Sequence, residues 1–280
     1  MFEILTKENL CEAVIRMDIA APLIAAKVQP GQFVILRVSE EGERIPLTVA
    51  DSNPNTGTIT LIFQTVGATT LALSRKSVGE SLQDLVGPLG RATDTDGIQK
   101  VAIIGGGVGC AIAYPVAKKL FNQGAEVHCI TGFRNRDLSI LQSEFAAVSH
   151  KCVTMTDDGS LGEQGLVTDA LRRLIESGES YDRVIAIGPL PMMKFVSLLT
   201  KEYHIPTIVS MNPIMIDGTG MCGGCRLTVG GETKFACVDG PEFDGHLVDF
   251  DLAMRRSGMY REAERHAYEQ SCNLFQKEVQ

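Results

Sequence analysis

The chain has 280 residues, of which 44% are hydrophobic and 21% are charged. This composition is typical of a folded protein with a buried core, and the length favours two domains over one. The net charge of -8 argues against nucleic acids and anionic membranes as partners, because either would favour a basic surface. Residues 1–20 lack the basic start and apolar run of a signal peptide, so we expect a soluble, cytoplasmic protein.

The first hundred residues alternate short β-rich runs with turn residues. Runs at 32–38, 45–51 and 58–64 are separated by the turn-rich stretches SEEGE and SNPNTG. Strands at this spacing are typical of a small antiparallel barrel. We therefore predict an all-β barrel over residues 1–97.

From Lys100 the pattern changes to alternating strands and helices, which predicts βαβ units and a parallel sheet over residues 98–211. The uncharged stretch 101–117 approaches the length of a membrane span. Its four glycines and Pro115 instead favour a strand, a tight turn and the start of a helix. Strands are expected at 100–104, 126–132, 152–156, 182–188 and 206–211, and helices at 108–124, 136–145, 165–178 and 190–203.

A third segment, residues 212–280, follows the α/β pattern. Residues 212–250 are rich in glycine and aspartate with little periodicity, and the polar stretch after them predicts one or two helices.

Two glycine-containing turns indicate a nucleotide site at one edge of the parallel sheet. Glycines between a strand and a helix let the backbone approach a pyrophosphate, and the helix N-terminus offers unpaired N–H groups. The first turn departs from the usual G-x-G-x-x-G spacing. The second lies at the carboxyl end of a later strand, on the edge where open α/β sheets bind ligands. The residues concerned are Gly105, Gly106, Gly107, Val108 and Gly109 in the first turn and Gly188 and Pro189 in the second.

Arg134 and Arg136 follow the second expected strand of this domain. An acid near this position binds the ribose hydroxyls of NAD, whereas arginine accommodates the 2′-phosphate of NADP. The two arginines favour NADP on this local chemistry, and a solvated surface role is the alternative.

The eight cysteines are expected to be reduced, because no export signal is present. Cys110, Cys129 and Cys152 lie in apolar surroundings and are expected to be small buried hydrophobes.

Three further cysteines are clustered and indicate a metal centre. Plant-type [2Fe–2S] sites show C-x4-C-x2-C with a fourth cysteine further on. Cys222, Cys225 and Cys237 fill three of these four positions, and Asp217 stands at the first. An anionic carboxylate oxygen can bind ferric iron, so we expect these four residues to be the ligands of a [2Fe–2S] cluster.

Other arrangements of these cysteines remain open. Zinc prefers two C-x-x-C pairs or added histidines, and the nearest histidine is His246. A Cys222–Cys225 disulfide would leave Cys237 without a partner. Cys272 is a fourth-ligand alternative, although it lies far along the chain in a charged context.

Five motifs follow one another over residues 1–210: R-x-P-x-T at 44–48, G-x-T-T at 67–70, GPLG at 87–90, the glycine turn, and GPLPMM at 188–193. Motifs of these kinds in this order resemble the ferredoxin reductase superfamily. The resemblance implies a six-stranded barrel that binds FAD and an α/β domain that binds a nicotinamide nucleotide.

The resemblance also implies roles for barrel residues. Arg44 would bind the FAD pyrophosphate, and Thr48 would lie beside the reactive edge of the flavin. Many members have a tyrosine where this chain has Pro46. The proline cannot provide the ring-stacking contact that a tyrosine would make with the flavin. The remaining implied FAD-binding residues are Leu47, Phe63, Gln64, Gly67, Thr69 and Thr70.

The cysteine-containing segment after residue 211 limits the resemblance to two related families. One is the electron-transfer subunits of type B dihydroorotate dehydrogenase, which have four cysteines in this loop. With aspartate first, the loop is more similar to the small subunits of electron-bifurcating NADH-dependent reduced ferredoxin:NADP oxidoreductases.

This second resemblance implies hydride exchange between NAD(H) and FAD, with NADP(H) as the alternative nucleotide. It also implies electron exchange between the [2Fe–2S] cluster and a larger subunit that carries flavin and [4Fe–4S] clusters. No side-chain acid, base or nucleophile is expected to act. A redox carrier or sensor without turnover is the non-enzymatic alternative.

Overall fold

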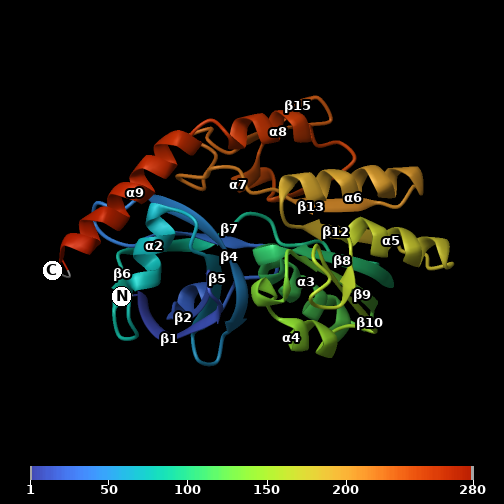
Figure 1. The fold of residues 1–280 in the computed structure, drawn as a ribbon, viewed down its shortest axis with the longest axis horizontal. Helices are drawn as coiled ribbons and strands as arrows, with labels where there is room; N and C mark the ends of the chain where they lie inside the picture. The colour runs from blue at the N-terminus through green and yellow to red at the C-terminus, as the bar shows by residue number, and fades with distance from the viewer. Residues whose placement is uncertain (1, 279–280) are drawn as a thin grey trace.

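The computed structural model describes residues 2–278, with side chains described as far as residue 269. Figure 1 shows the β barrel beside the α/β domain, with the cysteine-bearing segment along the top and the last helix lying beside the barrel. No helix among the described residues is long and apolar enough to cross a membrane.

The barrel sheet has seven strands in the order β6-β1-β2-β5-β4-β3-β7, of which β6 has only two residues. The strands expected at 32–38, 45–51 and 58–64 are confirmed as β3, β4 and β5. The long hairpin β1–β2 was not expected, because β1 carries charged residues along an exposed face. The barrel elements are β1 Phe2–Cys11, β2 Val14–Ala20, α1 Pro22–Ala25, β3 Phe33–Arg37, β4 Arg44–Asn53, β5 Thr58–Gln64, α2 Ala68–Arg75, β6 Ser81–Leu82 and β7 Asp84–Leu89.

The second sheet has the order β11-β10-β9-β8-β12-β13-β16, and all its pairs are parallel except β13–β16. The strand order reverses direction at β8, so the crevice for a ligand is expected between β8 and β12. Its elements are β8 Lys100–Gly106, α3 Cys110–Asn122, β9 Glu126–Phe133, α4 Gln142–Ala147, β10 Lys151–Thr156, β11 Glu163–Gln164, α5 Val167–Glu176, β12 Arg183–Ile187, α6 Leu190–Glu202 and β13 Thr207–Ser210.

The helix expected at 136–145 is wrong in extent. Arg136–Leu138 form one 3-10 turn, and α4 begins only at Gln142. Leu141 has a left-handed backbone with φ of 57°, which an α-helix cannot contain. Asn135 caps the 3-10 turn by accepting the N–H of Leu138.

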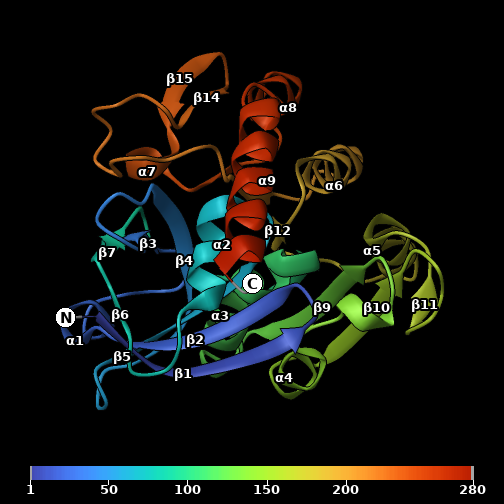
Figure 2. The ribbon, with the colours of Figure 1, turned by 60° about the vertical axis from the view of Figure 1, so that its left-hand side comes forward.

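The third segment is joined to the α/β domain by a strand. β16 pairs antiparallel with β13, so it extends the same sheet. One or two polar helices were expected here, and the structure has two, α8 and α9. The helix α9 runs beside α2 of the barrel (Figure 2). The elements are β14 Arg226–Val229, β15 Glu232–Phe235, α7 Ala236–Asp239, β16 Glu242–Asp244, α8 Phe250–Ser257 and α9 Arg261–Glu278.

The domain limits at 97/98 and 211/212 stay predictions. The first falls between β7 and β8, and the second falls directly after β13. Separate apolar clusters fill the barrel and the two faces of the parallel sheet. The cluster on one sheet face also includes Cys225 and Cys237, so the cysteine segment shares a core with the α/β domain.

Candidate active site and iron–sulfur loop

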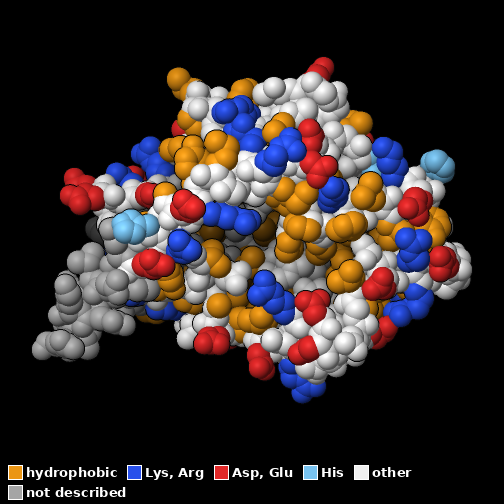
Figure 3. Space-filling model, turned by 45° about the horizontal axis from the view of Figure 1, so that its top comes forward, with side chains coloured by type: hydrophobic (Ala, Val, Ile, Leu, Met, Phe, Trp, Pro, Cys, Tyr) orange, Lys and Arg blue, Asp and Glu red, His pale blue; other side chains and the backbone are white. Residues whose placement is uncertain are grey.

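A cleft of about 940 Å³ lies between the barrel and the carboxyl ends of the parallel strands. Figure 3 shows hydrophobic side chains gathered around a hollow in the middle of the molecule. The cleft brings together many of the expected site residues: Pro46, Leu47, Thr48, Phe63, Gln64, Thr70, Gly106, Gly107, Val108, Gly109, Arg134, Gly188 and Pro189.

The barrel wall of the cleft is formed by β3, β4 and β5. Thr48 pairs with Phe33 across the β3–β4 ladder, and both line the cleft. Among the described residues, none forms a hydrogen bond with the Thr48 hydroxyl. A free hydroxyl on an apolar wall suits a flat aromatic ligand with one polar edge.

Four expected residues lie outside the cleft lining. Arg44 is exposed and lies 3.9 Å from Asp84, and the Thr69 hydroxyl donates to Glu43 at 3.3 Å. Gly67 is the N-cap residue of α2, and a Cβ atom there would face open space. The fourth, Gly105, is buried against α3.

Thr70 has a structural task at the start of α2. Its hydroxyl oxygen accepts the backbone N–H groups of Val66 and Gly67. The N-terminus of α2 remains a suitable place for a diphosphate, because its first N–H groups lack partners within the helix. The FAD roles of all these residues stay predictions.

The two glycine turns pack directly against each other. A Cβ atom on Gly109 would lie 2.5 Å from the Ile187 carbonyl oxygen and 2.7 Å from the Gly188 Cα. Gly107 has φ of 54° and faces open space, so its backbone is accessible to a ligand. This geometry fits a pyrophosphate held against backbone at the crevice.

The two arginines after β9 differ in their surroundings. Arg134 lines the cleft. Arg136 instead donates from Nε to the Ser160 carbonyl oxygen at 3.0 Å and serves the neighbouring loop. The sequence alone did not separate them.

Several lining residues were not anticipated from the sequence. Asp157 and Leu166–Thr168 follow β10 and β11, and Phe195 lies on α6. The position of Asp157 directly after an expected strand could have suggested it. Other residues from separate segments also line the cleft: Val14, Ile62, Gly132, Met211, Asn212, Met215 and Pro241.

The cysteine loop is organised around Asp217. Its carboxylate oxygens accept the backbone N–H groups of Thr219 at 3.0 Å and Cys222 at 2.8 Å. These N–H groups hold the pKa of Asp217 below its ordinary value, so the side chain stays anionic. Gly218 has φ of 74° and packs so closely on Leu89 and Ile35 that a Cβ atom would clash.

Cys225 and Cys237 bring their sulfurs within 3.2 Å of each other. This separation is far above the roughly 2.05 Å of a disulfide, and the described cysteines are free. The pKa of Cys237 rises to about 12, first because the thiol is buried, then because of Cys225 and, more weakly, the charge of Asp217. Such a site favours a bound cation, which stabilises thiolates.

The remaining cysteine of the loop, Cys222, is exposed, and its sulfur accepts the N–H of Gly224. His246 is engaged elsewhere, because its Nε2 lies 3.0 Å from the Thr200 hydroxyl. The side chain of Cys272, the alternative fourth ligand, lies outside the described residues. Three other cysteines were expected to be buried. Cys110 and Cys129 are buried, and Cys152 is half-buried.

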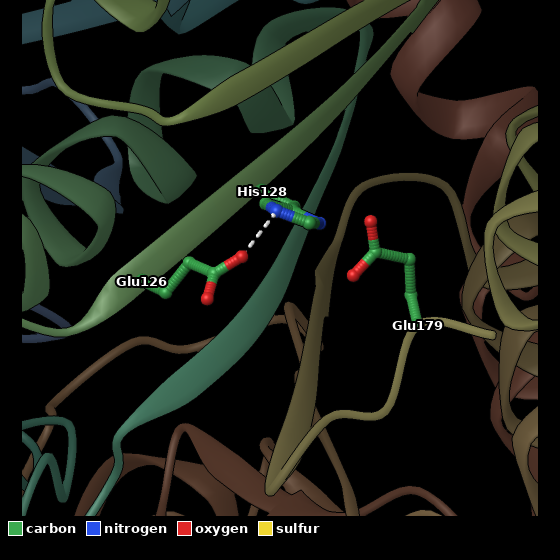
Figure 4. A group of neighbouring side chains, drawn as sticks. All are labelled: Glu126, His128 and Glu179. Carbon is green, nitrogen blue, oxygen red and sulfur yellow. Dashed lines mark hydrogen bonds and ion pairs between the residues drawn. The ribbon is translucent and has the colours of Figure 1, made fainter.

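A second cluster of titratable groups lies at the amino ends of the parallel strands, opposite the ends that line the cleft (Figure 4). His128 contacts Glu126 at 3.0 Å and the Tyr181 hydroxyl at 2.9 Å, and Glu179 lies nearby. Lys100 Nζ lies 2.9 Å from Glu126 and 2.5 Å from Glu179.

The Lys100 ammonium therefore neutralises both carboxylates of this group. Lys100 and Lys151 lower the pKa of Glu179 to about 2, and burial lowers that of His128. This cluster joins the strands and is far from the cleft.

Comparison with known families agrees with this arrangement. Residues 212–249 match the iron–sulfur cluster binding domain of dihydroorotate dehydrogenase B. Residues 103–198 match the oxidoreductase NAD-binding domain. A barrel, a nucleotide sheet and a cysteine loop of this kind define an iron–sulfur flavoprotein oxidoreductase of the ferredoxin reductase type.

The chain belongs to the family of dihydroorotate dehydrogenase B electron-transfer subunits and their homologues. A homologue of this subunit from Thermotoga maritima is 46% identical over 95% of this chain and 94% of its own length. The electron-transfer subunit of Geobacillus thermodenitrificans is 32% identical over 86% of this chain and 94% of its own. A structure of NADH-dependent reduced ferredoxin-NADP oxidoreductase, studied for flavin-based electron bifurcation, matches with a TM-score of 0.91 and 44% identity over 96% of this chain and 97% of that one.

The cofactors of this subunit are FAD, a [2Fe–2S] cluster and NAD(H). The residues present fit them: an apolar barrel wall for the flavin, open glycine backbone for the nucleotide and paired thiols for iron. When bound, these groups supply the hydride and single-electron chemistry. The side chains orient them and exclude water.

Proposed function

We propose that the chain is the NADH-side subunit of an electron-bifurcating ferredoxin:NADP oxidoreductase. Electrons would pass between NAD(H), FAD and the [2Fe–2S] cluster, and from there to a larger subunit with flavin and [4Fe–4S] clusters. We further propose that Asp217, Cys222, Cys225 and Cys237 hold the cluster. Free thiols at these positions suit a reducing compartment such as the cytoplasm.

One observation carries this proposal: the cleft and the cysteine loop are continuous. Met215 lines the cleft with Thr48, and Asp217 begins the cysteine loop two residues later. Gly218 then packs against β3 and β7 of the barrel. Short covalent and packed paths of this kind suit direct electron transfer between a flavin and a cluster.

The face around the loop supports docking of the larger subunit. Met221 is 88% exposed, and three further exposed apolar side chains belong to the loop or contact its glycines: Ile214 and Ile216 near Gly224, and Val238 near Gly220. Grouped exposed apolar side chains next to an exposed cysteine are typical of an interaction site. We call these four residues the apolar rim.

Anaerobic purification tests the proposal. The isolated chain is expected to contain one FAD and two irons and to reduce a dye with NADH. Reduction of ferredoxin is expected only after the larger subunit is added. Protein with flavin but no iron, or no NADH-dependent dye reduction, would contradict it.

The second candidate is the NAD-linked subunit of a dihydroorotate dehydrogenase, which the match over residues 212–249 favours. The two functions separate by partner: a large subunit that oxidises dihydroorotate and binds FMN supports this candidate. A partner with extra iron and FAD supports bifurcation.

A further inference from the structure

We propose that Arg91 and Arg226 clamp the two turns that carry the loop cysteines and favour the reduced state of the iron–sulfur cluster. This inference rests on the proposed function, which assigns the cluster to this loop. Neither arginine is a ligand. Both act through the loop and through their charge, so they are positioning residues.

Arg226 closes the turn at residues 222–226. It directly follows Cys225, and its Nη1 donates to the Gly223 carbonyl oxygen at 3.0 Å. The Arg226 backbone N–H is directed at the same oxygen at 3.4 Å. Gly223 has φ of 67°, a left-handed backbone that glycine adopts most readily. The arginine therefore holds the chain between Cys222 and Cys225 in a closed turn.

Arg91 ties the turn at residues 236–240 to the barrel. It lies two residues after the end of β7. Its backbone N–H donates to the Gly240 carbonyl oxygen at 2.7 Å, and its Nε donates to the Val238 carbonyl oxygen at 3.2 Å. Val238 directly follows Cys237. One residue of the barrel thus fixes both sides of the turn that carries this cysteine.

The two clamped turns meet at the buried thiols. The Cys225 and Cys237 sulfurs lie 3.2 Å apart, and the Cys237 N–H is directed at the Cys225 sulfur at 3.4 Å. Arg91 and Arg226 are exposed, so they hold these turns from the solvent side. Because each clamp fixes one turn, the separation of the two sulfurs depends on both arginines.

The two guanidinium groups also carry charge that no acid neutralises. Within the described part of the chain, no ion pair joins Arg91 or Arg226 to a carboxylate. Lys234 of the same segment differs, because its Nζ lies 2.7 Å from Glu232. The proposed ligands are all anionic, and an electron from the reduced flavin adds a further negative charge. Nearby cations stabilise that added charge, and net charge is one of the factors that set a cluster potential.

Arg91→Gln and Arg226→Gln test the effect of the charge. Each removes one positive charge and leaves an amide that can donate a hydrogen bond. Redox titration of the purified full chain, followed by EPR spectroscopy of the reduced cluster, is expected to show a lower midpoint potential. The equilibrium constant for one-electron reduction is expected to fall by about 2- to 30-fold, the effect of one charge near a protein surface. This fall corresponds to about 20–90 mV at 59 mV per tenfold.

Two sets of variants control for this shift. Arg91→Lys and Arg226→Lys keep the charge and are expected to keep a midpoint potential near that of wild type. Arg172→Gln removes the charge of an exposed arginine on α5, outside the cysteine segment. It is expected to leave the potential unchanged. Loss of iron from a glutamine variant with recovery in the matching lysine variant would support a charge-dependent site, whereas loss from both would overturn the electrostatic role.

Hydrogen exchange of the iron-free protein tests the clamp without the cluster. Alanine removes both the donor and the charge. Arg226→Ala is expected to speed amide exchange at residues 222–226, and Arg91→Ala is expected to speed it at residues 236–240. Exchange at the wild-type rate in both variants would show that the arginines do not hold the turns.

The remaining outcomes separate this inference from the proposed function. Wild-type potentials in both glutamine variants would overturn the inference. If those variants also bind the larger subunit more weakly, the arginines belong to its docking face instead. Wild-type protein that shows no [2Fe–2S] signal on reduction would overturn the proposed function itself, and with it the redox role of the arginines.

Discussion

The Asp217 carboxylate accepts the backbone N–H of Cys222 at 2.8 Å, so the residue that we propose as the first ligand also shapes the turn that presents the proposed second ligand. Its other oxygen accepts the N–H of Thr219. Both hydrogen bonds favour the ionised carboxylate. Asp217 is therefore suited to bind iron and to order the loop, and the two roles can be separated by substitution.

Asp217→Asn keeps an oxygen acceptor for the loop but removes the negative charge. We expect it to lose most of the iron and the visible cluster spectrum, with FAD content unchanged. Asp217→Cys is expected to retain a cluster with a shifted redox potential, because thiolate is the usual ligand at this position. Iron analysis and EPR spectroscopy of the reduced proteins measure both. Wild-type iron content in Asp217→Asn would assign Asp217 to loop structure alone.

The apolar rim gives a prediction about the partner. Met221→Asp places a charge on the most exposed side chain of the proposed docking face. We expect the affinity for the larger subunit to fall by about tenfold or more, as at a contact worth over 1 kcal/mol. Co-purification or biolayer interferometry with the larger subunit measures this.

The control for the rim is Leu23→Asp. Leu23 is 81% exposed on α1 of the barrel, outside the rim. It is expected to leave the affinity unchanged. Equal effects of the two substitutions on the affinity would show that the larger subunit does not dock at the cysteine loop.

Gly109→Ala tests the contact between the two glycine turns. The added methyl group would meet backbone atoms of Ile187 and Gly188, which cannot move without shifting β12. We expect a loss of about 1–3 kcal/mol of stability, typical of overpacking, together with weaker NAD⁺ binding.

Gly124→Ala is the comparison for Gly109→Ala. Gly124 has φ of 88° with open space around it, so only backbone strain of about 1–2 kcal/mol applies. NAD⁺ affinity is expected to stay at the wild-type value in this variant. Thermal melts and calorimetry on both proteins distinguish loss of stability from loss of the nucleotide turn.

The sequence predicted the parts of the site that local pattern determines. Strand-to-helix turns, the cysteine spacing and the barrel motif at 44–48 are each contained in a short stretch of chain. Asp157 directly follows an expected strand and could have been found from that pattern, whereas Met215 was missed because it reaches the cleft through packing between distant segments. The helix at 136–145 failed at Leu141, where the apolar periodicity continues but the backbone is left-handed. Periodicity reports burial, and it does not report a single residue's backbone dihedral.

A half-buried acid, Glu242, at the junction of the three segments gives a pH-dependent prediction. Glu242 on β16 accepts the Thr93 hydroxyl at 2.7 Å and lies against Gly31 of the barrel. It follows Pro241, which lines the cleft. Burial raises the pKa of Glu242 from 4.5 to about 7.

Because the folded-state pKa of Glu242 is raised, its stabilising contribution is complete below pH 4.5 and is lost as the pH rises to about 7. The loss amounts to about 3 kcal/mol, since each pKa unit corresponds to about 1.4 kcal/mol. Glu242→Gln keeps an acceptor for Thr93 and cannot ionise, so its stability relative to wild type is expected to increase between pH 5 and pH 8. Glu41→Gln, on an exposed turn, is the control and should show a constant difference. Thermal midpoints of the three proteins at both pH values test this, and a Glu242→Gln difference that does not change with pH would show that the carboxyl ionises freely in the fold.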